Sequence, residues 1–184
     1  MSFLVAAVVF VGLLSVVNLF LLLAVIRRLR EHANALRNVA MPPPFTPPGT
    51  KLPEFTATDT TGTAVTRATF SVGTGDSDSD GAIVVGMFST DCSACDEHLP
   101  EFAARVRHLG RERVMALVVG DGPKRETFTT ALAPIATVVV EDRDGPVYAA
   151  FRRPPFPGFY LVDGEGVVTV SAQSLDELPI SANV

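Results

Sequence analysis

The residues of this chain best suited to chemistry are its two cysteines, in Cys92-Ser93-Ala94-Cys95. They follow an apolar run of strand length and precede a segment with helical periodicity, so Cys92 is expected at the start of a helix. Unpaired N–H groups and the helix dipole at such a position favour a thiolate. Two intervening residues bring the second sulfur within bonding range, so Cys95 can resolve a mixed disulfide on Cys92. The pattern predicts a pair that exchanges thiols and disulfides.

Two other uses of the pair have less support. A zinc site would need two more ligands, but the chain has no further cysteine, and His98 and His108 do not have the spacing of a closed site. A structural disulfide across three residues closes almost no loop and would stabilise little. Redox activity is therefore the favoured interpretation.

Segment 73–81 is rich in Gly and Asp, and its Asp-x-Asp-x-Asp-Gly spacing is similar to a calcium-binding loop. The twelfth position of such a loop should be Glu, for bidentate ligation, and it is Met87 here. A solvated acidic loop is the favoured interpretation. The sequence predicts neither a metal site nor a bound cofactor.

Strand and helix signals alternate around the cysteines. Strands are expected over 54–60, 63–69, 82–88, 114–119, 136–140, 159–162 and 167–171, and helices over 93–109, 124–132 and 146–151, with an abbreviated last helix over 174–180. Strands that alternate with helices and end in a hairpin predict an α/β sandwich around a mixed sheet.

The N-terminal segment is apolar and carries no charge from Phe3 to Ile26. At about 1.5 Å per residue it extends about 36 Å, enough to cross a hydrocarbon core of about 30 Å. A cleaved signal peptide would have a basic residue before a shorter apolar core, and only Met1 and Ser2 come before this one. The prediction is one transmembrane helix, retained as an anchor over residues 1–26.

Residues 27–48 join this anchor to the domain expected over 49–184. Residues 27–40 keep helical spacing, and five prolines between 41 and 49 predict a semi-rigid spacer. Outside residues 27–40 the chain holds 11 basic and 19 acidic residues, a net charge of −8. Such a domain repels phosphates, so no nucleic-acid partner is predicted.

Further motifs have the spacing of one known family. They are segment 52–56 with Asp59 and Gly62, the strand, turn and helix start over 84–95, Pro100 and segment 156–163. Over about residues 47–172 the chain resembles the thioredoxin-like superfamily, in particular its membrane-anchored TlpA-like branch, which includes accessory proteins of methylamine dehydrogenase maturation. The resemblance implies a thioredoxin-like fold. It also implies that Pro157 is a cis-proline facing the disulfide, beside backbone that receives the substrate chain.

The sequence departs from this family at three positions near the cysteines. Thr90-Asp91 stands where many relatives have Trp, and Gly86 stands where thioredoxin has a buried acid. His98 replaces a Glu that is frequent in reductive relatives. Because histidine titrates near neutral pH and lies one turn after Cys95, His98 is a candidate general base. The alternative is a solvated surface histidine.

These features predict membrane-tethered thiol–disulfide exchange on protein clients, with electrons from an upstream redox partner. Asp91, Asp96 and Glu97 place negative charge around the pair, and no Lys or Arg is closer in sequence than Arg105. Negative charge opposes a thiolate, so a reducing or moderate couple is expected.

Two other functions of the same fold are alternatives. A peroxiredoxin-like antioxidant enzyme of the AhpC/TSA type needs Pro seven and Thr or Ser three residues before its reactive cysteine; Ser89 fits and Val85 does not. A non-catalytic assembly factor would instead bind a client without turnover.

Two arguments disagree about the side of the membrane. The arginines that follow the apolar segment favour a cytoplasmic domain by the positive-inside rule. The family resemblance favours the outside, where disulfide chemistry persists. The prediction follows the family: a single-pass protein of the cell membrane with an extracytoplasmic catalytic domain.

Overall fold

The computed structural model describes residues 10, 12–15, 18–21, 45–73 and 82–180. The chain divides into two compact units, Met1–Pro42 and Pro43–Val184. Of the predicted anchor, short helical stretches between Phe10 and Leu21 are described, and their large apolar side chains are exposed. Among the described helices, none is long and apolar enough to cross a membrane. The remainder of the anchor, residues 22–44 and the acidic segment 74–81 lie outside the described residues.

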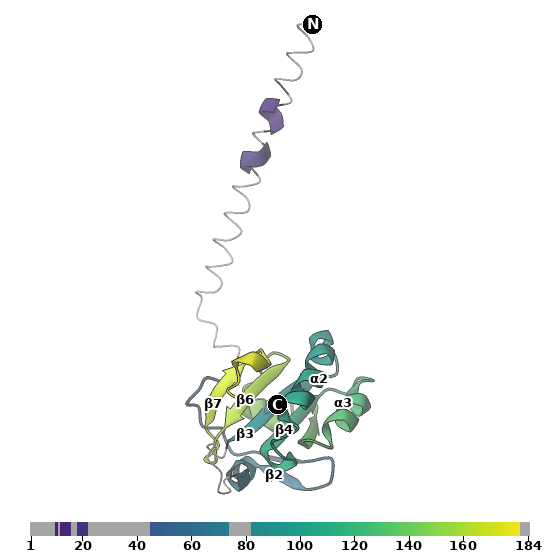
Figure 1. The fold of residues 1–184 in the computed structure, drawn as a ribbon, viewed down its shortest axis with the longest axis vertical. Helices are drawn as coiled ribbons and strands as arrows, with labels where there is room; N and C mark the ends of the chain where they lie inside the picture. Colours follow the sequence, from purple (N-terminus) through teal and green to yellow (C-terminus); the bar gives the residue numbers. More distant parts are fainter. Residues whose placement is uncertain (1–9, 11, 16–17, 22–44, 74–81, 181–184) are drawn as a thin grey trace. The chain divides into compact units, whose positions relative to one another are not determined.

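A five-stranded mixed sheet forms the centre of the second unit (Figure 1). Its strands lie in the order β5-β4-β3-β6-β7, with β3, β4 and β5 parallel and β6 and β7 antiparallel. The bounds are Ile83–Ser89 for β3, Val114–Val119 for β4, Thr137–Glu141 for β5, Gly158–Val162 for β6 and Val168–Ala172 for β7. This arrangement confirms the predicted α/β sandwich around a mixed sheet.

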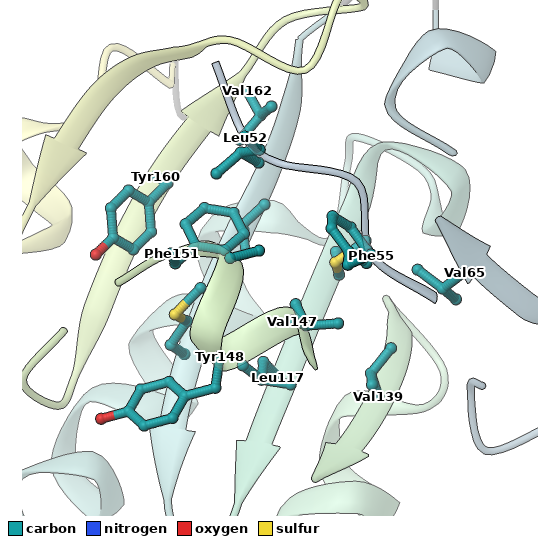
Figure 2. Packing of buried hydrophobic residues seen from close by; sticks show 14 of the residues in the cluster. Leu52, Phe55, Val65, Leu117, Val139, Val147, Tyr148, Phe151, Tyr160 and Val162 are labelled. Atoms are coloured by element: carbon teal, nitrogen blue, oxygen red, sulfur yellow. The ribbon is translucent and has the colours of Figure 1, made fainter. Parts of the chain in front are cut away.

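Three helices accompany the sheet: α2 over Ser93–Val106, α3 over Arg125–Leu132 and α4 over Pro146–Ala150. Every residue of β3 and β4 is buried, which is why both read as uninterrupted apolar runs. One apolar cluster contains side chains of α2 and α3, among them Cys95, Phe102 and Phe128. The second cluster contains side chains of α4 and the N-terminal part of the domain, such as Tyr148 and Leu52 (Figure 2).

The predicted first hairpin is present with shorter strands, β1 over Thr56–Thr58 and β2 over Ala64–Thr66. The Asp59 carboxylate accepts the N–H groups of Thr61 and Thr63, both at 2.8 Å, and so closes the turn. Burial opposes ionisation of this carboxyl, but these hydrogen bonds and Arg111 outweigh it and lower its pKa.

Besides these shorter strands, three expected elements differ in the structure. The helix expected over 93–109 ends at Val106. The second strand was expected to reach residue 69, but Arg67–Gly73 forms a 3-10 helix, and Thr69 Oγ1 accepts the N–H of Thr66 at the end of β2. The last helix, expected over 174–180, is a single 3-10 turn over Leu175–Glu177. Its buried Leu175 and Leu178 still cover the cluster that contains Cys95.

Candidate active site

Cys92 is the N-cap residue of α2. Its Sγ accepts the N–H of Cys95 at 3.2 Å, and its own N–H donates to the carbonyl of Ser89 at 3.2 Å. The side chain is half-buried. A helix N-terminus offers unpaired N–H donors and a positive dipole end, and both favour a thiolate over a thiol. Cys92 therefore lies at a helix N-terminus with its sulfur in reach of solvent.

Cys95 lies one turn further along α2 and is fully buried. The pKa of its thiol is raised to about 12: burial is the largest cause, Cys92 and the charge of Asp96 add to it, and a hydrogen bond with the Ser89 backbone opposes it. Both cysteines are free thiols in this structure. An accessible first sulfur and a buried, protonated second sulfur are the arrangement expected of a nucleophile and a resolving thiol.

Thr90, at one of the two positions where many relatives have Trp, connects the start of α2 to the loop between β4 and α3. Its N–H donates to the carbonyl of Val119 at 3.0 Å, and its Oγ1 accepts the N–H of Gly122 at 3.2 Å. A Cβ at Gly120 or Gly122 would approach this Oγ1 to 2.4 or 2.9 Å. The glycines thus leave space for the Thr90 side chain, and neither was singled out from the sequence.

Aromatic rings fill the space around Gly86, where thioredoxin has its buried acid. A Cβ at Gly86 would lie 2.7 Å from the ring of Phe102. That ring stacks on Phe159 with centroids 5.8 Å apart and meets Phe88 edge-on at 5.4 Å. A carboxyl side chain at this position would have no space, so proton transfer at Cys95 cannot use an acid here.

His98, the candidate base, is half-buried on α2. Its Nδ1 lies 3.6 Å from Glu101 Oε2, and its ring meets Phe159 edge-on. In the described part of the chain this Nδ1 has no hydrogen-bond partner, and no hydrogen bond joins His98 to either cysteine. The role of His98 as a base stays a prediction.

Two cations from distant parts of the chain pair with carboxylates beside the cysteines. Arg143 Nη2 lies 3.2 Å from Asp91 Oδ2, and the ammonium of Lys124 bonds the carboxylate of Asp96. All four side chains are substantially exposed, so each pair adds little stability. Cations that are distant in sequence thus pair with two of the three carboxylates that were expected to oppose the thiolate.

Pro157 follows a cis peptide bond from Phe156, which is the geometry that the family resemblance implied. It is buried immediately before β6, the strand that pairs with β3. The side chains of Phe156 and Cys92 both pack against the cluster that contains Cys95. The Phe156 ring also stacks on Tyr148, with centroids 5.1 Å apart. The catalytic role of Pro157 stays a prediction.

Metal ligation has no structural candidate among the residues described: no group of three or more His, Cys, Asp or Glu side chains lies close enough to bind an ion. Nothing in the geometry of Cys92 and Cys95 requires a bound cofactor, since thiol–disulfide exchange proceeds between sulfur atoms alone.

Comparisons with known proteins identify the family and the fold. Residues 48–171 match the AhpC/TSA family, and no curated protein sequence matches the chain. The thioredoxin domain of a thiol-disulfide oxidoreductase from Bacteroides vulgatus is similar, with 20% identity and a TM-score of 0.52 over 72% of this chain and 92% of that one. A thiol:disulfide interchange protein from Bacteroides sp. is similar at 19% identity and a TM-score of 0.51, over 71% and 84%. These likenesses show that the fold is thioredoxin-like.

Proposed function

Because the chain belongs to the AhpC/TSA family and has a thioredoxin-like fold, we propose that it is a thiol–disulfide oxidoreductase acting on protein clients through Cys92 and Cys95. The observation that carries the proposal is the contrast between the two sulfurs. Cys92 is accessible and accepts a helix N–H, whereas Cys95 is buried with a raised pKa. A structural pair would not need one sulfur in reach of solvent.

The exchange takes two steps. The Cys92 thiolate attacks one sulfur of a client disulfide, forms a mixed disulfide and releases the other client sulfur as a thiolate, which takes up a proton. Cys95 then loses its proton and attacks Cys92 Sγ, which forms the Cys92–Cys95 disulfide and releases the client as a dithiol. Two electrons and two protons from an upstream dithiol partner restore the reduced protein.

The direction we propose is reduction of client disulfides. Asp91, Asp96 and Glu97 oppose the thiolate of the reduced form, but Arg143 and Lys124 pair with the first two. The preference for a reducing couple is therefore weaker than the sequence alone suggested, and a moderate potential is expected.

The membrane-anchored TlpA-like branch and the cellular location are part of the same proposal. The uncharged segment from Phe3 to Ile26 supports a single anchor over residues 1–26, followed by a linking segment over 27–48 and the catalytic domain over 49–184. We propose that this domain is extracytoplasmic. A membrane-impermeant maleimide applied to intact cells should label Cys92; labelling that requires permeabilised cells would place the domain in the cytoplasm.

The experiment that tests the chemistry is a trap of the client intermediate. Cys95→Ser should accumulate mixed disulfides on Cys92, whereas the intact protein should reduce a protein disulfide catalytically and Cys92→Ser should do neither. Trapping without turnover by the intact protein would indicate a non-catalytic assembly factor.

Peroxide consumption by the same proteins tests the antioxidant alternative. That activity requires a proline where this chain has Val85, a fully buried residue in the middle of β3. We expect no catalytic consumption of peroxide, and rapid Cys92-dependent consumption would replace our proposal with a peroxiredoxin.

A further inference from the structure

Two consecutive arginines after α4 have a left-handed backbone conformation. The φ angles are 62° at Arg152 and 52° at Arg153. The N–H of Arg152 donates to the carbonyl of Ala149, and the N–H of Arg153 donates to that of Tyr148, which is the Schellman pattern that ends many helices. Glycine usually occupies the left-handed position, because an L side chain there is strained. Arginine does not stabilise the left-handed backbone at these two positions. We therefore expect the side chains to have a role in binding.

These arginines lie directly before the loop that contains cis-Pro157. Arg153 Nε donates to the carbonyl of Arg143 at 3.4 Å, and the Arg143 side chain in turn contacts the carboxylate of Asp91, next to Cys92. Positive charge from Arg143 and Arg153 also acts on the hydroxyl of Tyr148 and opposes the increase in its pKa that burial causes. A chain of contacts thus leads from Arg153 through Arg143 to Asp91, the residue before Cys92.

Both guanidinium groups are available to a partner. The ion pair of Arg153 is with Asp144, at 3.5 Å and with a carboxylate that is 98% exposed, so it can be exchanged at little cost. Arg152 is exposed, and within the described segments its side chain has no polar partner. These two exposed arginines therefore form a local positive site on a domain whose net charge is negative.

We propose that Arg152 and Arg153 are specificity-determining residues that bind carboxylate side chains flanking the reactive cysteine of a client. The inference rests on the proposed function, since it names the class of client. A guanidinium pairs with a carboxylate in a fixed two-point geometry, which gives orientation as well as attraction. Elsewhere the acidic domain would repel such a client, so the attraction selects both the client and the face that it approaches.

The test compares two disulfide-containing peptides that differ only beside the cysteine. The acidic peptide has Asp and Glu there, and the neutral peptide has Asn and Gln. Wild type should reduce the acidic peptide with a kcat/KM about fivefold higher, expressed mainly in KM. R152G/R153G removes both charges and relieves the strained backbone. It should lose the preference while its melting temperature rises by about 3–8 °C. R152K/R153K retains charge and strain but loses the two-point geometry, so it should keep part of the preference, intermediate between wild type and the glycine variant.

A wild type without preference, or a glycine variant that keeps it, would overturn the inference. Binding of both peptides to Cys92→Ser, measured by fluorescence anisotropy, requires no turnover. A tighter complex with the acidic peptide that depends on the two arginines supports the inference even if no peptide is reduced. Loss of all reduction by wild type would instead reject the proposed oxidoreductase.

Discussion

Removing the two cations beside the cysteines should make the redox couple more reducing. In Lys124→Gln/Arg143→Gln, the carboxylates of Asp96 and Asp91 lose their partners. At a pH at which Cys92 is ionised in the reduced form, a nearby cation stabilises its thiolate, whereas the disulfide carries no charge. Loss of both cations therefore destabilises the reduced form relative to the oxidised form and lowers the reduction potential.

The expected size follows from the exposure of the cations. Lys124 is 39% and Arg143 65% exposed, so a water-like dielectric applies. A unit charge about 7 Å from a thiolate contributes about 0.6 kcal/mol in water, and about half of that at 0.1 M salt. Two cations together should shift the potential by about 10–15 mV at 0.1 M salt and about 20 mV at 0.01 M. The corresponding equilibrium constants change about threefold and about fivefold.

Equilibration with glutathione at the two salt concentrations, followed by thiol trapping, measures this shift. Arg107→Gln is a matched control, because Arg107 is the exposed C-cap residue of α2, about 20 Å along the helix from its N-terminus. The opposite change, Asp91→Asn with Glu97→Gln, should make the couple more oxidising. A shift that is independent of salt, or one that Arg107→Gln reproduces, would show that exposed local charges do not set the potential.

The remaining predictions concern the two sulfurs and the loop next to them. Alkylation of the reduced protein should modify Cys92 before Cys95, because only Cys92 is accessible; mass spectrometry showing the reverse order would reject our assignment. Thr90→Val removes the acceptor of the Gly122 N–H and should lower the free energy of unfolding by about 1–2 kcal/mol in a denaturant titration, whereas Thr90→Ser should not. The raised pKa of Cys95 means that the unfolded state ionises first as pH rises above about 8.5. Thermal melts should therefore show the dithiol form, and not the disulfide form, losing stability from about pH 8.5 upward, and parallel losses would contradict this.

Local patterns were sufficient for the elements that surround the site. The strand predicted over 114–119 has the bounds of β4, and the helix predicted from residue 93 begins at Ser93. Each outcome has a local physical origin. A strand covered on both faces must be apolar throughout, and a helix needs an acceptor at its N-cap, here the sulfur of Cys92.

Contacts between distant loops could not be predicted in the same way. Arg143 reaches Asp91 across 52 positions of the sequence, and Lys124 reaches Asp96 across 28. Their pairing depends on the parallel order of β3, β4 and β5, which brings the loops after these strands to one edge of the sheet. The filling of space at Gly86 by Phe102 is likewise a matter of packing, which periodicity does not encode.

Proton transfer from Cys95 follows from the same packing. The aromatic rings around Gly86 leave no place for a buried acid, yet Cys95 must ionise before it can attack. Burial is the largest cause of its raised pKa, and hydrogen bonding and charge interaction with Cys92 are further causes. In the mixed disulfide Cys92 no longer carries a thiolate, so that part of the increase disappears and the pKa of Cys95 falls. The first step thus prepares the second: attack by Cys92 removes one of the causes that raise the pKa of Cys95, and the client thiolate released at the same moment is a base available to accept the proton.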